Sequence, residues 1–146
     1  MDERPGSDPA DVAAWRAERT AAAEARAAGL ERRRQRDSAE AARAIEEFLV
    51  RARAQGVEPV PLRARGYHGD ATFRTGLRGW YLRANRTVGI DTDGRFYVLS
   101  VPTGPLTWLR GARPAASDPP LVLGAGGRDG ESISMADALE KVLDAG

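Results

Sequence analysis

The stretch that decides the fold runs from residue 79 to residue 101 and reads GWYLRANRTVGIDTDGRFYVLSV. Three runs in it are rich in the aromatic and β-branched residues that favour strands: Trp80–Arg83, Thr87–Asp91 and Arg95–Val101. Asn85 lies between the first two runs, and Asp93-Gly94 lies between the last two. Because Asn, Asp and Gly tolerate the positive φ of tight hairpin turns, this pattern predicts a three-stranded antiparallel meander.

The last run of the meander is apolar on both of its faces. Side chains alternate along a strand, so Phe96 and Val98 should point to one side and Tyr97 and Leu99 to the other. A strand with apolar residues on both sides is typical of the middle of a sheet that is covered on both faces. We therefore expect this strand to be central.

Elements on both sides of the meander complete an α+β fold. Strand-like patterns recur in four shorter runs: Pro59–Arg65, Thr72–Thr75, Leu106–Arg110 and Leu121–Leu123. Ser134 followed by Asp137 is a helix N-cap pattern. The apolar side of the helix that follows would be formed by Met135, Leu139, Val142 and Leu143. The sequence thus predicts an antiparallel sheet of four or five strands and a short C-terminal helix.

A long N-terminal helical region is predicted for residues 8–55. Asp8 can cap it, and alanine, arginine and glutamate, which favour helices, predominate in its first half. Gly29 is expected to interrupt the helix. Residues 1–37 contain few large apolar side chains, namely Met1, Val12, Trp15 and Leu30. These residues could form a solvated helix or a partner-binding arm, or be partly disordered. We expect a polar helical arm that frays, because isolated helices are marginal in water.

The second part of this region carries a clear apolar stripe. Asp37 is expected to begin a helix of about residues 38–55, and Gly56 to end it with a positive φ. The stripe repeats at helical spacing through Ala41, Ile45, Phe48, Leu49 and Ala52. This helix should pack on the sheet, so that residues 38–146 form one compact α+β domain.

The composition excludes several kinds of site. The chain has no cysteine, so disulfides and thiolate metal sites are impossible. No set of side chains has the spacing of a metal site. No apolar run is long enough to span a bilayer, and the polar start MDERPGSDPA lacks the apolar stretch of a secretion signal. We expect a cytoplasmic protein without metal, cofactor or membrane insertion.

The residues that could carry catalysis are better explained as loop and turn residues. The glycine-rich loop 124–130 lacks a Gly-Lys-Ser/Thr ending, and Asp129 stands where a dinucleotide-binding fingerprint needs glycine. His68, the one histidine, lies in a glycine-bounded loop with no marked nucleophile. Asp91 and Asp93 suit a hairpin turn. We expect that the protein is not an enzyme.

Charge is distributed unevenly, although the net charge is only +1. Residues 57–114 carry nine arginines and four acids, a balance of +5, and residues 115–146 carry two bases and six acids, a balance of −4. The basic segment could bind an anionic partner, or the two segments could attract each other within one fold. Arginine outnumbers lysine 21 to 1, which GC-rich codons explain without selection for guanidinium chemistry.

A face of the sheet is the strongest candidate for a binding surface. By strand alternation, Tyr81 and Arg83 share one face of their strand, and Arg95 and Tyr97 share one face of theirs. If the register brings these faces together, Arg63 and Arg65 could lie near them. Aromatic rings among guanidinium groups suit single-stranded nucleic acid, because bases stack on the rings and phosphates bind the arginines. Alternatively, the tyrosines belong to the core and the arginines extend from its rim.

Two segments also carry a resemblance to known proteins. The run GWYLRANRTVGIDTDGRFYVLSVP, followed by SDPPLVLGAGGRDGESI, resembles small proteins of unknown function from high-GC Gram-positive bacteria. The resemblance covers about residues 58–146. It implies no activity and no functional residues.

These observations lead to two hypotheses about function. In the first, the protein is a non-enzymatic binding or adaptor protein, whose N-terminal helix uses Trp15 to contact a protein partner or a second copy of itself. The conspicuous helix that cannot bury itself supports this hypothesis. In the second, the basic segment 57–114 binds nucleic acid, with an affinity that falls steeply as salt rises.

Overall fold

The computed structural model describes residues 8–124 and 132–146 of the chain. The chain divides into two units, Met1–Arg36 and Asp37–Gly146. Helix α1 (Pro9–Gln55) contributes residues to both units. Among the described residues, the buried hydrophobic side chains all lie in the second unit, which we call the body. The fold is α+β, with a long N-terminal helix, a five-stranded mostly antiparallel sheet and a short C-terminal helix.

Helix α1 begins and ends where the sequence predicts. The Ala10 N–H donates to Asp8 Oδ1 at 3.0 Å, which confirms Asp8 as the cap, and Gly56 follows the helix with φ +70°. The predicted interruption at Gly29 and the second start at Asp37 are wrong, because one helix runs through both. A single glycine costs a helix only about 1 kcal/mol, which strong helix-forming neighbours outweigh.

The sheet has the strand order β4-β3-β2-β1-β5. Its strands are β1 (Val60–Gly66), β2 (Thr72–Tyr81), β3 (Val88–Asp91), β4 (Phe96–Val98) and β5 (Ser100–Val101). The meander β2-β3-β4 is antiparallel, as predicted, whereas β5 pairs with β1 in parallel. A separate two-stranded sheet pairs β6 (Val122–Leu123) with β7 (Ile133–Ser134).

The predicted central strand Arg95–Val101 is instead two strands at opposite edges of the sheet. β4 pairs with β3 at one edge and β5 pairs with β1 at the other, and Leu99 alone separates them. The sheet therefore curls until its two edges meet in one segment, which leaves few unpaired strand edges. Curling also explains why the segment is apolar on both sides: Phe96 faces the helices, and Tyr97 and Leu99 face the inside of the curl.

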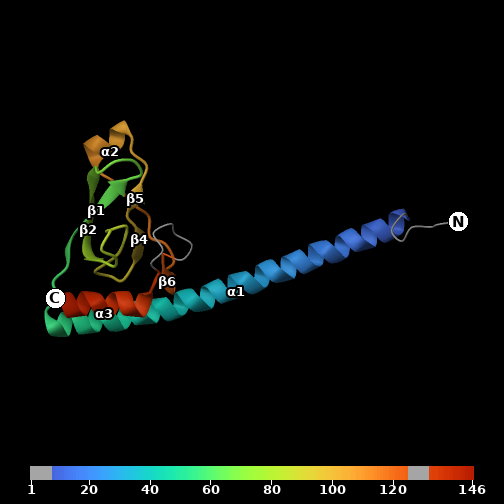
Figure 1. Cartoon of the computed structure of the whole chain (residues 1–146), viewed down its shortest axis with the longest axis horizontal. Helices are drawn as coiled ribbons and strands as arrows, with labels where there is room; N and C mark the ends of the chain where they lie inside the picture. Colours follow the sequence, from blue (N-terminus) through green and yellow to red (C-terminus); the bar gives the residue numbers. More distant parts are fainter. Residues whose placement is uncertain (1–7, 125–131) are drawn as a thin grey trace. The chain divides into compact units, whose positions relative to one another are not determined.

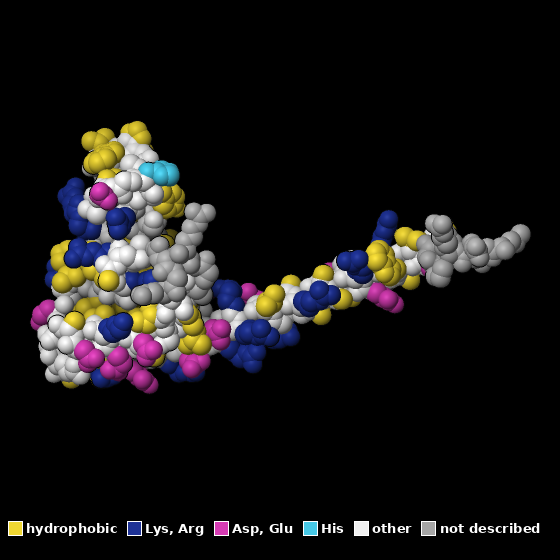
Figure 2. Space-filling view, viewed as in Figure 1, with side chains coloured by type: hydrophobic (Ala, Val, Ile, Leu, Met, Phe, Trp, Pro, Cys, Tyr) yellow, Lys and Arg dark blue, Asp and Glu magenta, His cyan; other side chains and the backbone are white. Residues whose placement is uncertain are grey.

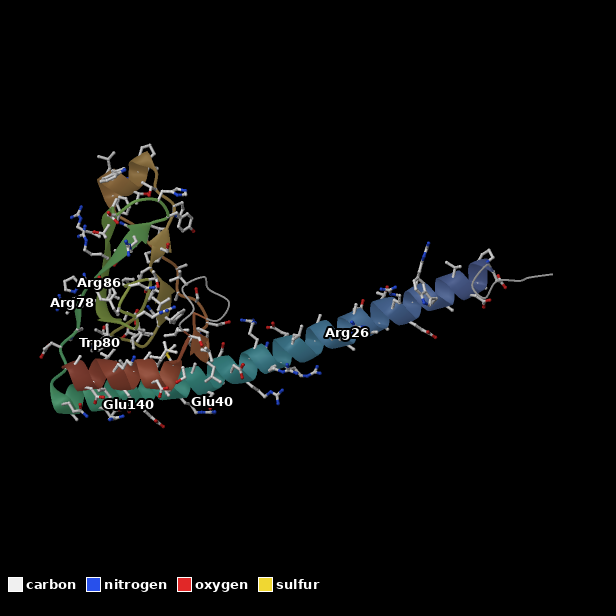
Figure 3. The ribbon with its side chains drawn as sticks, in the orientation of Figure 1. Arg26, Glu40, Arg78, Trp80, Arg86 and Glu140 are labelled. Atoms are coloured by element: carbon white, nitrogen blue, oxygen red, sulfur yellow. The ribbon has the colours of Figure 1, made fainter. Side chains whose placement is uncertain are left out.

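The main core lies between the outside of the curled sheet and two helices of the body (Figure 1). Trp80, Ile90 and Phe96 are neighbours across three strands, and the residues of α1 predicted to be buried pack against this row. Helix α3 (Met135–Ala145) covers the remainder of this face. The ring of Phe48 meets that of Trp80 edge-on at 5.1 Å, and Figure 3 shows Trp80 between the sheet and α3.

The ends of the two shorter helices follow local sequence rules. Ser134 Oγ accepts the Asp137 N–H at 3.1 Å, which confirms the predicted cap of α3. The predicted strand Leu106–Arg110 is wrong, because these residues belong to helix α2 (Pro105–Arg110). Proline at the first helical position has its φ already set for a helix, and Gly104 before it is extended.

Candidate functional site

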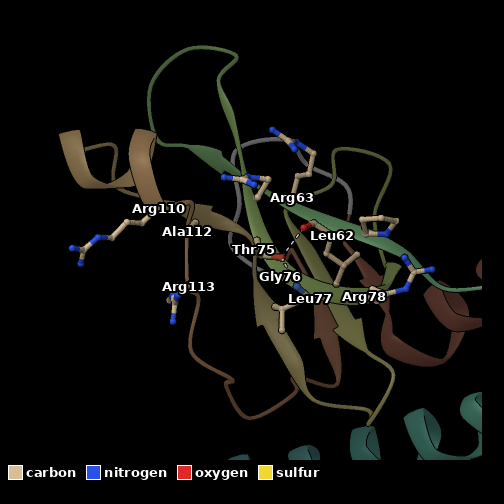
Figure 4. A pocket seen from close by; sticks show the side chains of 11 residues that line it. Leu62, Arg63, Thr75, Gly76, Leu77, Arg78, Arg110, Ala112 and Arg113 are labelled. Carbon is tan, nitrogen blue, oxygen red and sulfur yellow. Dashed lines mark hydrogen bonds between the residues drawn. The ribbon is translucent and has the colours of Figure 1, made fainter.

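A groove of about 630 Å³ runs along the β1–β2 hairpin and the segment after α2 (Figure 4). Eleven described residues line it, and none of them is acidic. Five of them are exposed arginines: Arg63, Arg74, Arg78, Arg110 and Arg113. In Figure 4, Arg110 and Arg113 lie on one side of Leu77, and Arg78 lies on the other. The groove therefore combines an apolar floor with cationic walls.

An irregularity in the hairpin shapes this floor. Arg63 is the cross-strand partner of Arg74 and Pro61 that of Arg78, so β2 has two more residues than β1 between the two pairs. The extra length is taken up around Gly76, whose φ of +73° suits glycine. The Thr75 hydroxyl donates to the Leu62 carbonyl at 2.6 Å and holds the irregular segment in place.

A backbone contact brings the other two arginines to the same groove. The Ala112 N–H donates to the Arg74 carbonyl oxygen at 2.7 Å, which joins the chain after α2 to β2. Gly111 allows this close approach, because it has φ +78° and a Cβ there would lie 2.5 Å from the same oxygen. Arg110 and Arg113 flank this contact and therefore lie beside Arg74.

Two of the groove arginines face each other across neighbouring strands. Arg63 and Arg74 are directly opposed across the strands, and like charges in that position destabilise a sheet. Within the described part of the chain, the Arg63 side chain donates to the hydroxyl and carbonyl oxygens of Thr72, and the Arg78 Nη2 donates to the Pro59 carbonyl. Each guanidinium has five N–H donors, so these bonds leave donors for a bound anion.

Among the sheet residues predicted to form a binding surface, the structure brings Arg63 alone into this groove. Tyr81 and Tyr97 do share a face, on either side of Gly89, but that face is the inside of the curled sheet. The Tyr97 hydroxyl donates to Asp91 Oδ2 at 2.9 Å. The Tyr81 hydroxyl oxygen accepts the Arg63 N–H at 2.9 Å. The tyrosines thus serve as packing residues with satisfied hydroxyl groups.

The other three predicted arginines lie elsewhere. Arg65 is on β1 but lies 3.6 Å from the Asp70 carboxylate. Arg83 follows the end of β2 and lines a different recess, together with Asp137 and Glu140. Arg95 lies in the turn before β4, where its N–H donates to Asp91 Oδ1. Strand alternation did not place Arg83 and Arg95 because both lie outside the strands.

Comparison with known proteins gives no family for this chain. No protein-family model, no curated protein and no solved structure matches it. Among the described residues, no three metal-binding side chains cluster together. None of the described helices has the length and apolar character that crossing a membrane requires. The glycine-rich loop 124–130 lies outside the described residues apart from Gly124, and exposed His68 lies in the β1–β2 loop.

Sequence reasoning missed four of the five groove arginines. Arg74 and Arg78 lie on β2, but the sequence predicted two separate runs, Thr72–Thr75 and Trp80–Arg83, where the structure has one strand, so Arg78 fell outside both. Arg110 and Arg113 depend on the contact between Ala112 and Arg74, which has no local sequence signal. Gly76 in the run Thr-Gly-Leu-Arg was the one available indication of a bulge.

Trp15 lies in the other unit, on α1. Its side chain is 55% exposed, and the guanidinium of Arg19 lies 4.9 Å from the centre of its ring. None of the described residues 8–36 is buried, and Leu30 is also exposed. The helix there is rich in alanine, arginine and glutamate, so its helicity has a local cause that requires no partner.

Proposed function

We propose that this protein is a non-enzymatic binding protein that holds nucleic acid in the arginine-lined groove of its body. One observation carries the proposal: five exposed arginines surround a groove whose eleven described lining residues include no acid. The partner must therefore be anionic. Catalysis would need a further group, and the groove offers neither an acid nor a histidine as a general base.

A phosphodiester chain fits this arrangement better than a single small anion. The arginines are spread along the groove from Arg78 at one end to Arg110 and Arg113 at the other, so they match a ligand with repeated charges. The planar guanidinium is suited to paired hydrogen bonds with phosphate oxygens. Contacts of this kind bind the backbone and carry little information about base sequence.

Salt dependence tests the proposal. If all five arginines neutralise phosphates, the logarithm of the association constant should fall with the logarithm of salt concentration with a slope of about −3.5 to −4.5. Fluorescence anisotropy with a labelled oligonucleotide between about 50 and about 200 mM salt measures this slope. Arg74→Ala should weaken binding and reduce the slope by about 0.7 to 0.9, because one phosphate contact is lost.

Arg43→Ala is the matched control, since Arg43 is an exposed arginine on α1 and does not line the groove. It makes the same change in net charge. Equal slopes for the two variants would show that the groove has no special part in binding. Failure of the full chain to bind any oligonucleotide in low salt would overturn the proposal itself.

The exposed side chains of residues 8–36 support a second candidate function, self-association through α1. Trp15 and Leu30 are large apolar groups that are more than half exposed, and burying them against a second copy would remove that surface from water. Sedimentation equilibrium of the full chain should then give a dimer that Trp15→Ala weakens, whereas Arg16→Ala, at a neighbouring exposed position, should not. A monomer at every concentration contradicts this candidate.

A further inference from the structure

We infer that Trp108 on α2 stacks on an unpaired base of the ligand, so that the groove binds single-stranded rather than duplex nucleic acid. This inference rests on the proposed function of the groove. It assigns a role to a feature that the arginines leave unexplained, namely the apolar surface of α2.

Helix α2 is short, yet it exposes several large apolar side chains. Trp108 is 65% exposed, Leu109 is 76% exposed, and none of the six residues of the helix is buried. In Figure 2, hydrophobic side chains gather over α2 at the end of the body, with the histidine and an acidic side chain beside them and Lys or Arg side chains a little further along. Exposed clusters of large apolar residues in a folded protein are typical of binding sites.

The indole of Trp108 is held in place on α2 by a contact with β2. Its ring meets that of the buried Phe73 edge-on, with 5.0 Å between ring centres and 78° between the planes. Trp108 lies on the same short helix as Arg110, which lines the groove, although residues two apart point to different sides of a helix. A fixed, exposed ring on the helix that carries Arg110 can stack on a base while the groove arginines bind other phosphates of the same strand.

Single strands fit this geometry and duplexes do not. In a duplex each base is stacked between its neighbours, so a side chain at the surface cannot cover the face of a base. In a single strand the bases can turn outward and stack on aromatic rings. An anionic membrane is the other surface that could accept exposed tryptophan and leucine, but a flat layer of headgroups would not fill a groove walled by arginines.

The test compares one labelled oligothymidylate with a duplex of equal length, using the full chain and anisotropy. Trp108→Ala should weaken binding of the single strand about five- to 150-fold, the loss expected when one stacked base is lost. Duplex binding and the salt slope should stay unchanged, because tryptophan carries no charge. Trp108→Phe should restore part of the affinity, and circular dichroism shows whether each variant is folded.

Leu109→Ala is the matched control, because Leu109 is exposed on the same helix but has no ring. It should change single-strand affinity less than Trp108→Ala does. If the protein binds the duplex as tightly as the single strand, or if Trp108→Ala matches the control, the stacking inference is wrong and the groove proposal stands. If no oligonucleotide binds but vesicles of phosphatidylglycerol do, both proposals are wrong.

Discussion

The hydrogen bond between Tyr97 and Asp91 gives the most direct test of how the curled sheet is stabilised. Asp91 is 6% exposed, and its Oδ1 accepts the N–H groups of Asp93 and Arg95 at 2.9 Å each. Its Oδ2 accepts the Tyr97 hydroxyl, also at 2.9 Å. Tyr97→Phe keeps the ring and removes this donor. A hydrogen bond to a charged group contributes about 1.5 to 3 kcal/mol, so the free energy of unfolding should fall by that amount.

Urea unfolding followed by circular dichroism measures this loss. Tyr67→Phe provides the control, because Tyr67 is an exposed residue of the β1–β2 loop. Tyr67→Phe also removes a hydroxyl group, but it should change the free energy of unfolding by less than about 0.5 kcal/mol. If Tyr97→Phe costs no more than Tyr67→Phe, then the bond to Asp91 does not stabilise the fold and this reasoning is refuted.

The same bond predicts how stability depends on pH. Burial of the ring, followed by the hydrogen bond and the negative charge of Asp91, raises the pKa of Tyr97 above its ordinary value. The unfolded chain loses this proton near pH 10, the ordinary pKa of tyrosine, whereas the folded protein retains it to higher pH. The contribution of Tyr97 is therefore complete below about pH 10 and declines above it. The stability difference between the wild type and Tyr97→Phe should shrink over the same range.

Three further predictions concern packing and the division of the chain. Gly79→Ala should destabilise the body by about 3 kcal/mol or more in urea unfolding, because the new Cβ would overlap the Ile90 carbonyl oxygen. Gly104→Ala is the control: its Cβ would lie in open space, so it should change stability little. Phe48→Ala should cost about 3 to 5 kcal/mol in the same assay, because it opens a cavity against Trp80. Residues 37–146 alone should unfold cooperatively with unchanged stability, because the buried hydrophobic side chains of the described residues all lie among them. A non-cooperative thermal transition would contradict this.

Local sequence patterns were sufficient for most elements of the fold. The turn at Asp93-Gly94, the cap at Ser134 and the apolar stripe that includes Ile45 and Phe48 each depend on residues close together in the chain. Turn type, capping and helical periodicity are physical properties of such short segments. They predict where elements begin, end and bury their side chains.

The closure of the sheet could not be predicted in this way. The run Arg95–Val101 reads as one continuous strand, and its division at Leu99 depends on the distant partners Thr87 and Arg65. Leu99 donates its N–H to the Thr87 carbonyl and accepts the Arg65 N–H, so it connects both edges of the sheet. The tyrosines were placed on the correct strands, but whether their face is open or enclosed depends on this closure.

The positions of the arginines carry information that their number does not. A bias toward GC-rich codons can raise the arginine content throughout a chain, and residues 1–56 indeed have eleven arginines with eleven acids. Such a bias does not separate the two signs of charge. Around the groove, acids are absent from the described lining and Arg63 faces Arg74 at a cost to the sheet. Codon bias does not explain this separation of charge, whereas binding of an anionic ligand does. The two explanations are distinguished by comparing the salt slope of Arg74→Ala with that of Arg43→Ala.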